Sequence, residues 1–348
     1  MKRLLTSFAV MPLALALALL GNPAHAAPQA PVTKTFDVSD LSTGAPPKLV
    51  WSETTDGTTS TVHGPAGDTT VQGDVAALAP MGSGFVVQTV KGGRTTTRWV
   101  GADGSPGRSS WRSGFGLATS PDGEAVAFTT RRGGVRAIDE DGDRVLRMPS
   151  VPSKELATPV YVSSGDCKED ETSNGCAILV NSTRRLESWV VSSHGIVDIT
   201  GFKAVGTARG RWAGGIVQAT DTGTCSVMRR NLKNRWRTCD NQLSDISPDQ
   251  RRVLGTPAFA DGFGPTTLDV LDLRTGRVMT TWRSSRKVTT TYFDQVWEDA
   301  THVLVVTYHD EAFAVVRLDV TDGSMEYAVE PVADTDGDME SPFHLQTR

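Results

Sequence analysis

The chain has 348 residues, with 40 Asp and Glu against 35 Lys and Arg, and its formal net charge is −5. This balance lacks the excess of basic residues that nucleic-acid-binding proteins carry, so nucleic acid is not expected as a partner. Thr, Val, Gly, Ser and Asp are abundant relative to helix-forming residues, which favours many short strands joined by tight turns.

The first 26 residues have the pattern of a cleavable secretory signal peptide. A positive start, Lys2-Arg3, is followed by an apolar stretch over residues 4–20 and the small-x-small cleavage signature Ala24-His25-Ala26. The longest uninterrupted apolar run, residues 13–20, is shorter than the ~20 residues that span a membrane. We therefore predict a secreted, extracytoplasmic protein without membrane insertion, whose residues 27–31 form a flexible leader.

One structural unit recurs after the leader: a turn, an apolar strand, a second strand and a hairpin turn that contains Gly or Asn. Three copies are clear, at residues 117–145, 246–278 and 297–325. The hairpin-turn marker recurs about every 40 residues, at Gly67, Gly104, Gly142, Gly195, Asn234, Gly276 and Gly323. This period is typical of the four-stranded blades of a β-propeller.

The predicted blades must pack against one another to bury their faces. Continuous apolar runs such as residues 125–128 and 303–306 suit inner strands that are covered on both sides. We therefore predict an all-β fold, a seven-bladed β-propeller of four-stranded antiparallel blades that spans residues 32–348 as one domain. Six or eight blades fit the markers less well.

A closed propeller needs its first and last blades joined, and two segments are candidates for this role. Residues 35–39 alternate between apolar and polar side chains, as an added strand would, and the tail at residues 341–346 also has strand character. The sequence does not decide which of the two segments joins the first and last blades.

The chain has four cysteines: Cys167, Cys176, Cys225 and Cys239. In an exported protein they predict two disulfides, for which three pairings are possible. Cys225 and Cys239 lie symmetrically about Leu232, the expected tip of a hairpin, and Cys167 and Cys176 close a polar loop in the fourth blade. These neighbouring pairs are therefore the predicted ones. Zinc binding is not favoured, because the spacing lacks the CxxC pattern.

The turn Ser120-Pro-Asp-Gly123, followed by an apolar strand and repeated more weakly at residues 247–250, resembles the blade motif of secreted bacterial WD40-like and TolB-type propellers. By period, the resemblance covers most of the chain after the signal peptide. It implies a propeller that acts as a binding platform. It does not imply a Tol-Pal role, because no α/β domain like the one preceding the TolB propeller is recognisable.

Two charged clusters remain. Asp334, Asp336, Asp338 and Glu340 are spaced like the start of a calcium loop and are weak calcium candidates, although Gly and Glu are missing from the sixth and twelfth loop positions. The fifth blade has a basic outer hairpin, which either meets an anionic cell-wall polymer or, more simply, discourages sheet-to-sheet pairing. Its basic residues are Arg229, Arg230, Lys233, Arg235 and Arg237.

No catalytic motif is recognisable: GxSxG, HExxH and the sialidase Asp-box are all absent. We therefore predict a non-catalytic, monomeric binding module without a cofactor, whose partner is an unidentified protein or cell-envelope ligand. The alternative is an exported propeller hydrolase or lyase with carboxylates gathered at the axial channel. Asp122, Glu298 and Asp299 are acids at blade openings, but they are interpreted as turn residues. Two or more carboxylates with a His or Arg at the channel mouth would favour the enzyme.

Overall fold

The computed structural model describes residues 30–54, 57–138, 145–151, 157–167, 175–182, 184–199, 201–260, 264–285, 287, 289–335, 337 and 339–347. The predicted signal peptide lies outside these ranges. In the part of the chain that is described, no helix has the length and apolar character needed to cross a membrane.

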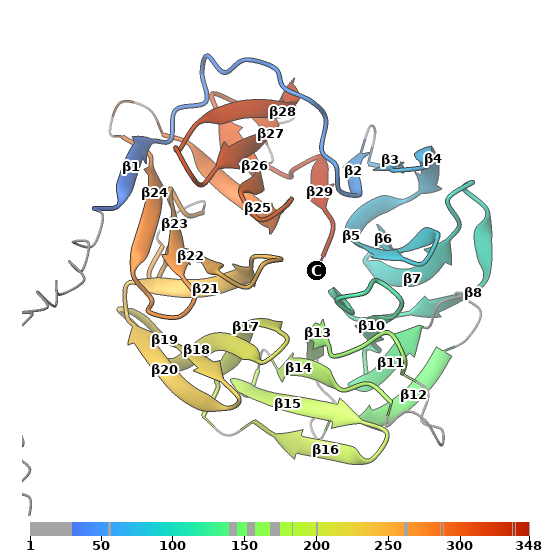
Figure 1. The fold of residues 1–348 in the computed structure, drawn as a ribbon. Coiled ribbons are helices and arrows are strands. Elements are labelled where there is room, and N and C mark those ends of the chain that lie inside the picture. Colours follow the sequence, from blue (N-terminus) through green and yellow to red (C-terminus); the bar gives the residue numbers. More distant parts are fainter. Residues whose placement is uncertain are drawn as a thin grey trace, which may run out of the picture. The chain divides into compact units, whose positions relative to one another are not determined.

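Seven sheets of mostly antiparallel strands are arranged around a central axis, which confirms the predicted seven-bladed all-β propeller (Figure 1). Blades two to seven follow the chain, and each begins with its innermost strand. Blade one consists of β2 (Trp51–Thr54), β3 (Thr59–Gly64), β4 (Gly67–Gln72) and β29 (Phe343–Leu345). Blades two to four consist of β5 (Asp74–Met81), β6 (Gly84–Lys91), β7 (Arg94–Val100), β8 (Pro106–Arg112); β9 (Leu117–Thr119), β10 (Val126–Thr129), β11 (Gly134–Ile138), β12 (Val145–Ser150); and β13 (Ala157–Val162), β14 (Ile178–Ser182), β15 (Glu187–Ser192), β16 (Gly195–Asp198).

The strands of the last three blades follow in chain order. They are β17 (Ala204–Arg209), β18 (Trp212–Thr220), β19 (Gly223–Arg230), β20 (Lys233–Thr238); β21 (Asn241–Ile246), β22 (Arg252–Pro257), β23 (Thr267–Asp272), β24 (Val278–Arg283); and β25 (Thr291–Trp297), β26 (His302–His309), β27 (Ala312–Asp319), β28 (Met325–Ala333).

The predicted markers fall where the third strand of a blade turns into the fourth. Gly276 and Gly323 adopt positive φ values of 74° and 77° in these turns, a conformation that glycine reaches without a steric penalty. In blade five the marker is displaced: Asn231 and Leu232 form the turn, with φ of 49° and 62°, and Asn234 lies just inside β20. Gly142 lies outside the described residues.

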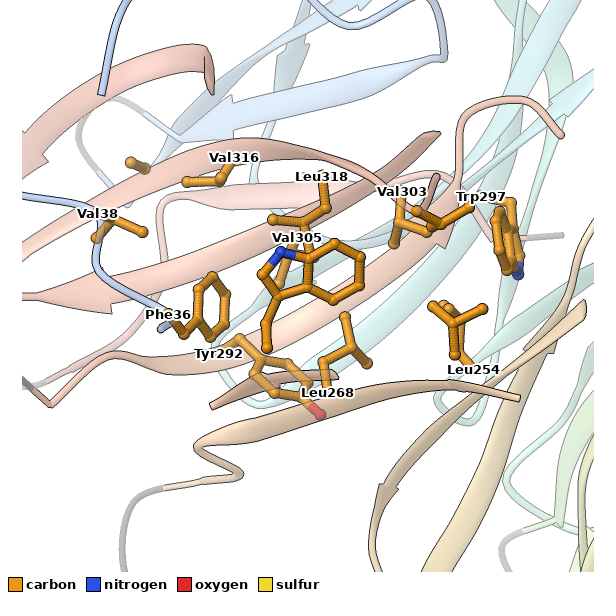
Figure 2. Close-up of a cluster of buried hydrophobic side chains, with 14 of the residues drawn as sticks. Phe36, Val38, Leu254, Leu268, Tyr292, Trp297, Val303, Val305, Val316 and Leu318 are labelled. Atoms are coloured by element: carbon orange, nitrogen blue, oxygen red, sulfur yellow. The ribbon is translucent and has the colours of Figure 1, made fainter. Parts of the chain in front are cut away.

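The C-terminal tail closes the ring. β29 pairs antiparallel with β2, with Trp51 opposite Leu345, and so becomes the innermost strand of blade one. The N-terminal candidate has another role. β1 (Val32–Thr35) is a parallel fifth strand on the outer edge of β24 in blade six. Figure 2 shows Phe36 and Val38, which follow β1, packed into the buried cluster between blades six and seven.

Both predicted disulfides are present, Cys167–Cys176 and Cys225–Cys239. The first joins the two ends of the β13–β14 connection in blade four, and the second ties the open end of the β19–β20 hairpin. Two disulfides indicate an oxidising, extracytoplasmic compartment.

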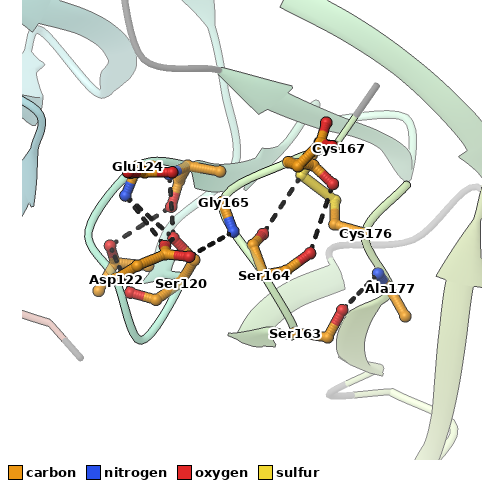
Figure 3. The surroundings of a disulfide bond; sticks show 12 residues. Ser120, Asp122, Glu124, Ser163, Ser164, Gly165, Cys167, Cys176 and Ala177 are labelled. Carbon is orange, nitrogen blue, oxygen red and sulfur yellow. Dashed lines mark hydrogen bonds between the residues drawn. A yellow bond between two sulfur atoms is a disulfide. The ribbon is translucent and has the colours of Figure 1, made fainter. Parts of the chain in front are cut away.

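The Ser120-Pro-Asp-Gly123 turn connects blade three to the first disulfide loop (Figure 3). Ser120 Oγ accepts the Ala125 N–H at 3.0 Å, which fixes the turn. Asp122 Oδ2 then accepts the N–H of Gly165 at 3.0 Å, two residues before Cys167. The motif therefore joins blade three to blade four.

Candidate functional site

A large cavity lies on the propeller axis. It has a volume of about 1300 Å³, and its wall contains residues from the inner strands, from the connections between blades, and from the segment around β29. Figure 1 shows that β29 and the residues after it approach the centre of the ring. Thr347 donates its N–H to the carbonyl of Leu78 in blade two at 2.7 Å, so the tail crosses from blade one to blade two along this wall.

The cavity wall is acidic. Among its described residues there is no Lys or Arg. Its carboxylates come from three blades and the tail: Asp74, Asp245, Asp294, Asp334 and Glu340. A concave surface with charges of one sign concentrates ions of the opposite sign, so this arrangement favours a cationic ligand.

Asp294 and His344 lie on neighbouring inner strands, β25 and β29. The N–H of Leu345 donates to Asp294 Oδ2 at 3.1 Å. Burial raises the pKa of the Asp294 carboxyl, and the Leu345 N–H and the charge of His344 offset this only in part. Burial likewise lowers the pKa of His344, against the opposing effect of the Asp294 and Asp74 carboxylates. The pair thus combines a carboxyl that releases its proton less readily than usual with an imidazole that releases its proton more readily.

Two other acids of the wall, Asp245 and Asp74, accept hydrogen bonds from neighbouring residues. Asp245 accepts the backbone N–H of Trp297 at 3.1 Å and so links blade six to blade seven. Asp74 accepts the Thr54 hydroxyl at 3.0 Å, an interaction that leaves one carboxylate oxygen available to a ligand. Asp74 is therefore the acid best suited to bind a cationic ligand, because burial favours the neutral form of Asp294.

The calcium candidates are placed only in part. Asp334 and Glu340 line the cavity, and Asp336 and Asp338 lie outside the described residues. Asp334 accepts the N–H groups of Gly337 and Met339 at 3.1 and 3.3 Å. The described ranges hold no group of three or more His, Cys, Asp or Glu arranged for a metal ion. Calcium binding stays a prediction.

Two aromatic side chains of the cavity wall are exposed. Phe115, just before β9, keeps 59% of its surface accessible, and Phe293 in β25 keeps 41%. Large exposed aromatics at a concave polar site commonly mark a binding surface, and their ring faces attract cations. Neither was identified from the sequence, where each is a single apolar residue in a loop or strand.

The acids singled out at blade openings do not line this cavity. Glu298 forms a buried ion pair with Arg317, and Asp299 accepts the backbone N–H groups of Thr301 and His302 at 2.8 and 2.9 Å. Both follow β25, at the turn into β26. Asp299 therefore has the contacts expected of a turn residue, whereas Glu298 takes part in a buried ion pair with a residue of β27.

No family model matches the sequence, and no curated protein matches it. Among the solved structures that match is the β-propeller domain of Cps50 (Swd1) from Myceliophteria thermophila, with 10% sequence identity and a TM-score of 0.49. The match covers 78% of this chain and 89% of that domain. No conclusion about function or partners follows from a similarity this distant.

Proposed function

We propose that the chain is an exported, non-catalytic binding module that takes a cationic peptide segment of a partner protein into its axial cavity. The observation that carries this proposal is the acidic wall, in which no described residue is Lys or Arg. The volume of about 1300 Å³ exceeds the roughly 300–1,000 Å³ of typical small-molecule pockets, which supports an extended peptide as the ligand. Phe115 and Phe293 supply aromatic faces for Lys or Arg side chains.

Fluorescein-labelled octalysine is a direct probe of this function. We expect it to bind the wild type in a salt-sensitive manner, and the variant D74N to bind about tenfold more weakly, because a charged hydrogen-bond partner is removed. Fluorescence anisotropy measures both affinities. The control is D221N, which removes one exposed acid outside the cavity. An equal loss in the control, or no binding by the wild type, would refute the proposal.

The paired pKa shifts of Asp294 and His344 favour hydrolysis as a second candidate function. Asp294 would donate its proton to a leaving group, and neutral His344 would take a proton from the attacking water. The same incubation separates the two functions, since mass spectrometry shows whether the peptide is returned intact. Cleavage that is lost in D294N would favour the enzyme, and an intact peptide would favour the binding module.

The Asp294→Asn variant also has a predicted effect on stability. The folded protein holds the Asp294 proton more tightly than the unfolded chain does, so stability is lost as pH rises through the folded-state pKa. Asparagine keeps an oxygen to accept the Leu345 N–H but has no proton to lose. We expect its Tm to exceed that of the wild type at pH 8 and the difference to shrink towards pH 4.

Differential scanning calorimetry at the two pH values tests this expectation. The Asp221→Asn variant, altered at an exposed position, serves as the control and should match the wild type at both pH values. A lower Tm for the Asp294→Asn variant at pH 8 would show that the ionised carboxylate stabilises the fold, contrary to the prediction.

A further inference from the structure

Blade five is strongly basic, although the whole chain has a negative net charge. Residues 201–240 contain eight Lys and Arg and only two Asp, a local charge of +6 in a chain with a net charge of −5. A concentration of one sign on one blade creates a local field that attracts anions, whatever the sign of the whole molecule.

A groove is present on this blade. It has a volume of about 340 Å³, and its lining includes Arg229, Arg235 and Arg237 together with the apolar side chains of Val217 and Val227. No described residue of its lining is Asp or Glu. We call this feature the arginine groove.

Two of its three guanidinium groups are held in position. The Arg229 guanidinium lies 4.2 Å from the centre of the Phe202 ring, and its Nε donates to Asn234 Oδ1 at 2.9 Å. Arg237 donates to the Gln218 side chain at 2.6 Å. Burial lowers the pKa of Arg229, as expected for a cation partly removed from water. Side chains that are already ordered lose little conformational freedom when a ligand binds.

Protection of the sheet edge does not explain this arrangement fully. β20 is the outermost strand of blade five, and its own basic residues suffice to discourage pairing with another sheet. Arg229, however, lies on β19, one strand further in. The register sets Arg229 opposite Asn234 and Val227 opposite Arg237, which places these side chains on the face that carries the groove.

The same hairpin supplies an internal comparison. Arg230 lies opposite Lys233, and because successive side chains of a strand alternate between its faces, this pair belongs to the other face. Arg230 lies instead near Trp212, with its guanidinium 5.4 Å from the ring centre. Neither residue lines the arginine groove.

We propose that the arginine groove binds a linear anionic polymer that carries phosphate groups. Guanidinium groups are planar forks that bind phosphate oxygens in pairs. Three of them in one groove, on a blade with a charge of +6, suit several successive phosphates better than a single ion. This site lies on the outer hairpin and does not depend on the function of the axial cavity.

Binding of fluorescently labelled long-chain polyphosphate tests the site. The double variant R229Q/R237Q should lose about tenfold or more in affinity, and the matched variant R230Q/K233Q, which removes the same charge from the other face, about threefold or less. Equal losses in the two variants would show general electrostatic attraction and would overturn the proposal. Thermal melts of both variants verify that each remains folded.

Competition experiments test the chemistry of the ligand. Unlabelled polyphosphate should displace the label at a far lower phosphate concentration than inorganic phosphate does, and polyglutamate should displace it only weakly. Inorganic phosphate of equal potency would overturn the assignment to a polymer. Polyglutamate of equal potency would overturn the assignment to phosphate.

Discussion

Deletion of residues 341–348 is expected to destroy the cooperative fold. The deletion removes β29, whose residues Phe343 and Leu345 are buried between blades seven and one beside Trp51. The inner edge of β2 then lacks a pairing partner, and an exposed strand edge promotes association between chains. We expect the deleted form to be aggregated or to melt far below the full chain, as measured by size-exclusion chromatography and thermal melts.

A point substitution tests the same closure without shortening the chain. Phe343→Ala should lower the free energy of unfolding by about 3–5 kcal/mol, the usual cost of removing a buried phenyl group. The control, Val332→Ala, alters a partly exposed residue in β28 and should cost roughly 0.5 kcal/mol or less. Closure by β29 would be contradicted by a deleted form that stays monomeric with an unchanged Tm.

Loss of the buried ion pair in blade seven should have the second largest effect. Glu298 has a fully buried side chain and Arg317 is 7% exposed. Arg317 donates to both Glu298 oxygens at 2.6 and 2.9 Å, and it also donates to the carbonyls of Ala45 and Pro46. The pair therefore holds the N-terminal segment against blade seven. Glu298→Gln leaves the buried Arg317 with only its second ion pair, to Glu326, so it should cost about 2–3 kcal/mol.

Urea denaturation of the Glu298→Gln variant at pH 7 gives this free energy directly. The wild type should also lose stability on acidification, because Arg317 holds the pKa of Glu298 below its usual value against the effect of burial. The stability that a lowered carboxyl pKa contributes is present above the unfolded-state pKa and is lost as pH falls through the folded-state pKa. Lys48→Met is the matched control. It removes a cation whose ion pair with Asp299, at 3.5 Å, is 67% and 37% exposed, and should cost about 0–1 kcal/mol. Similar costs for both variants would contradict the prediction.

The blade turns could be predicted from the sequence, whereas the residues of the axial site could not. Gly276 and Gly323 marked blade turns because turn geometry demands particular residues locally. Cys225 and Cys239 were paired because both belong to one hairpin. Asp294 could not be identified in this way, because a single acid in the segment Phe293-Asp-Gln295 looks like an ordinary polar residue of a strand.

The number of blades, the class of the fold and both disulfides could be predicted from the sequence, because they depend on a short-range period and on residues close together in the chain. The tertiary structure was needed to show that residues 341–346 close the ring and that residues 35–39 pack between blades six and seven instead. It also decided which acids meet at the axis and that Arg229 shares a face with Arg237. Such contacts join strands that are far apart in the chain. The sequence of a strand indicates which of its side chains are buried and where it turns, but it does not indicate which distant strand will lie beside it.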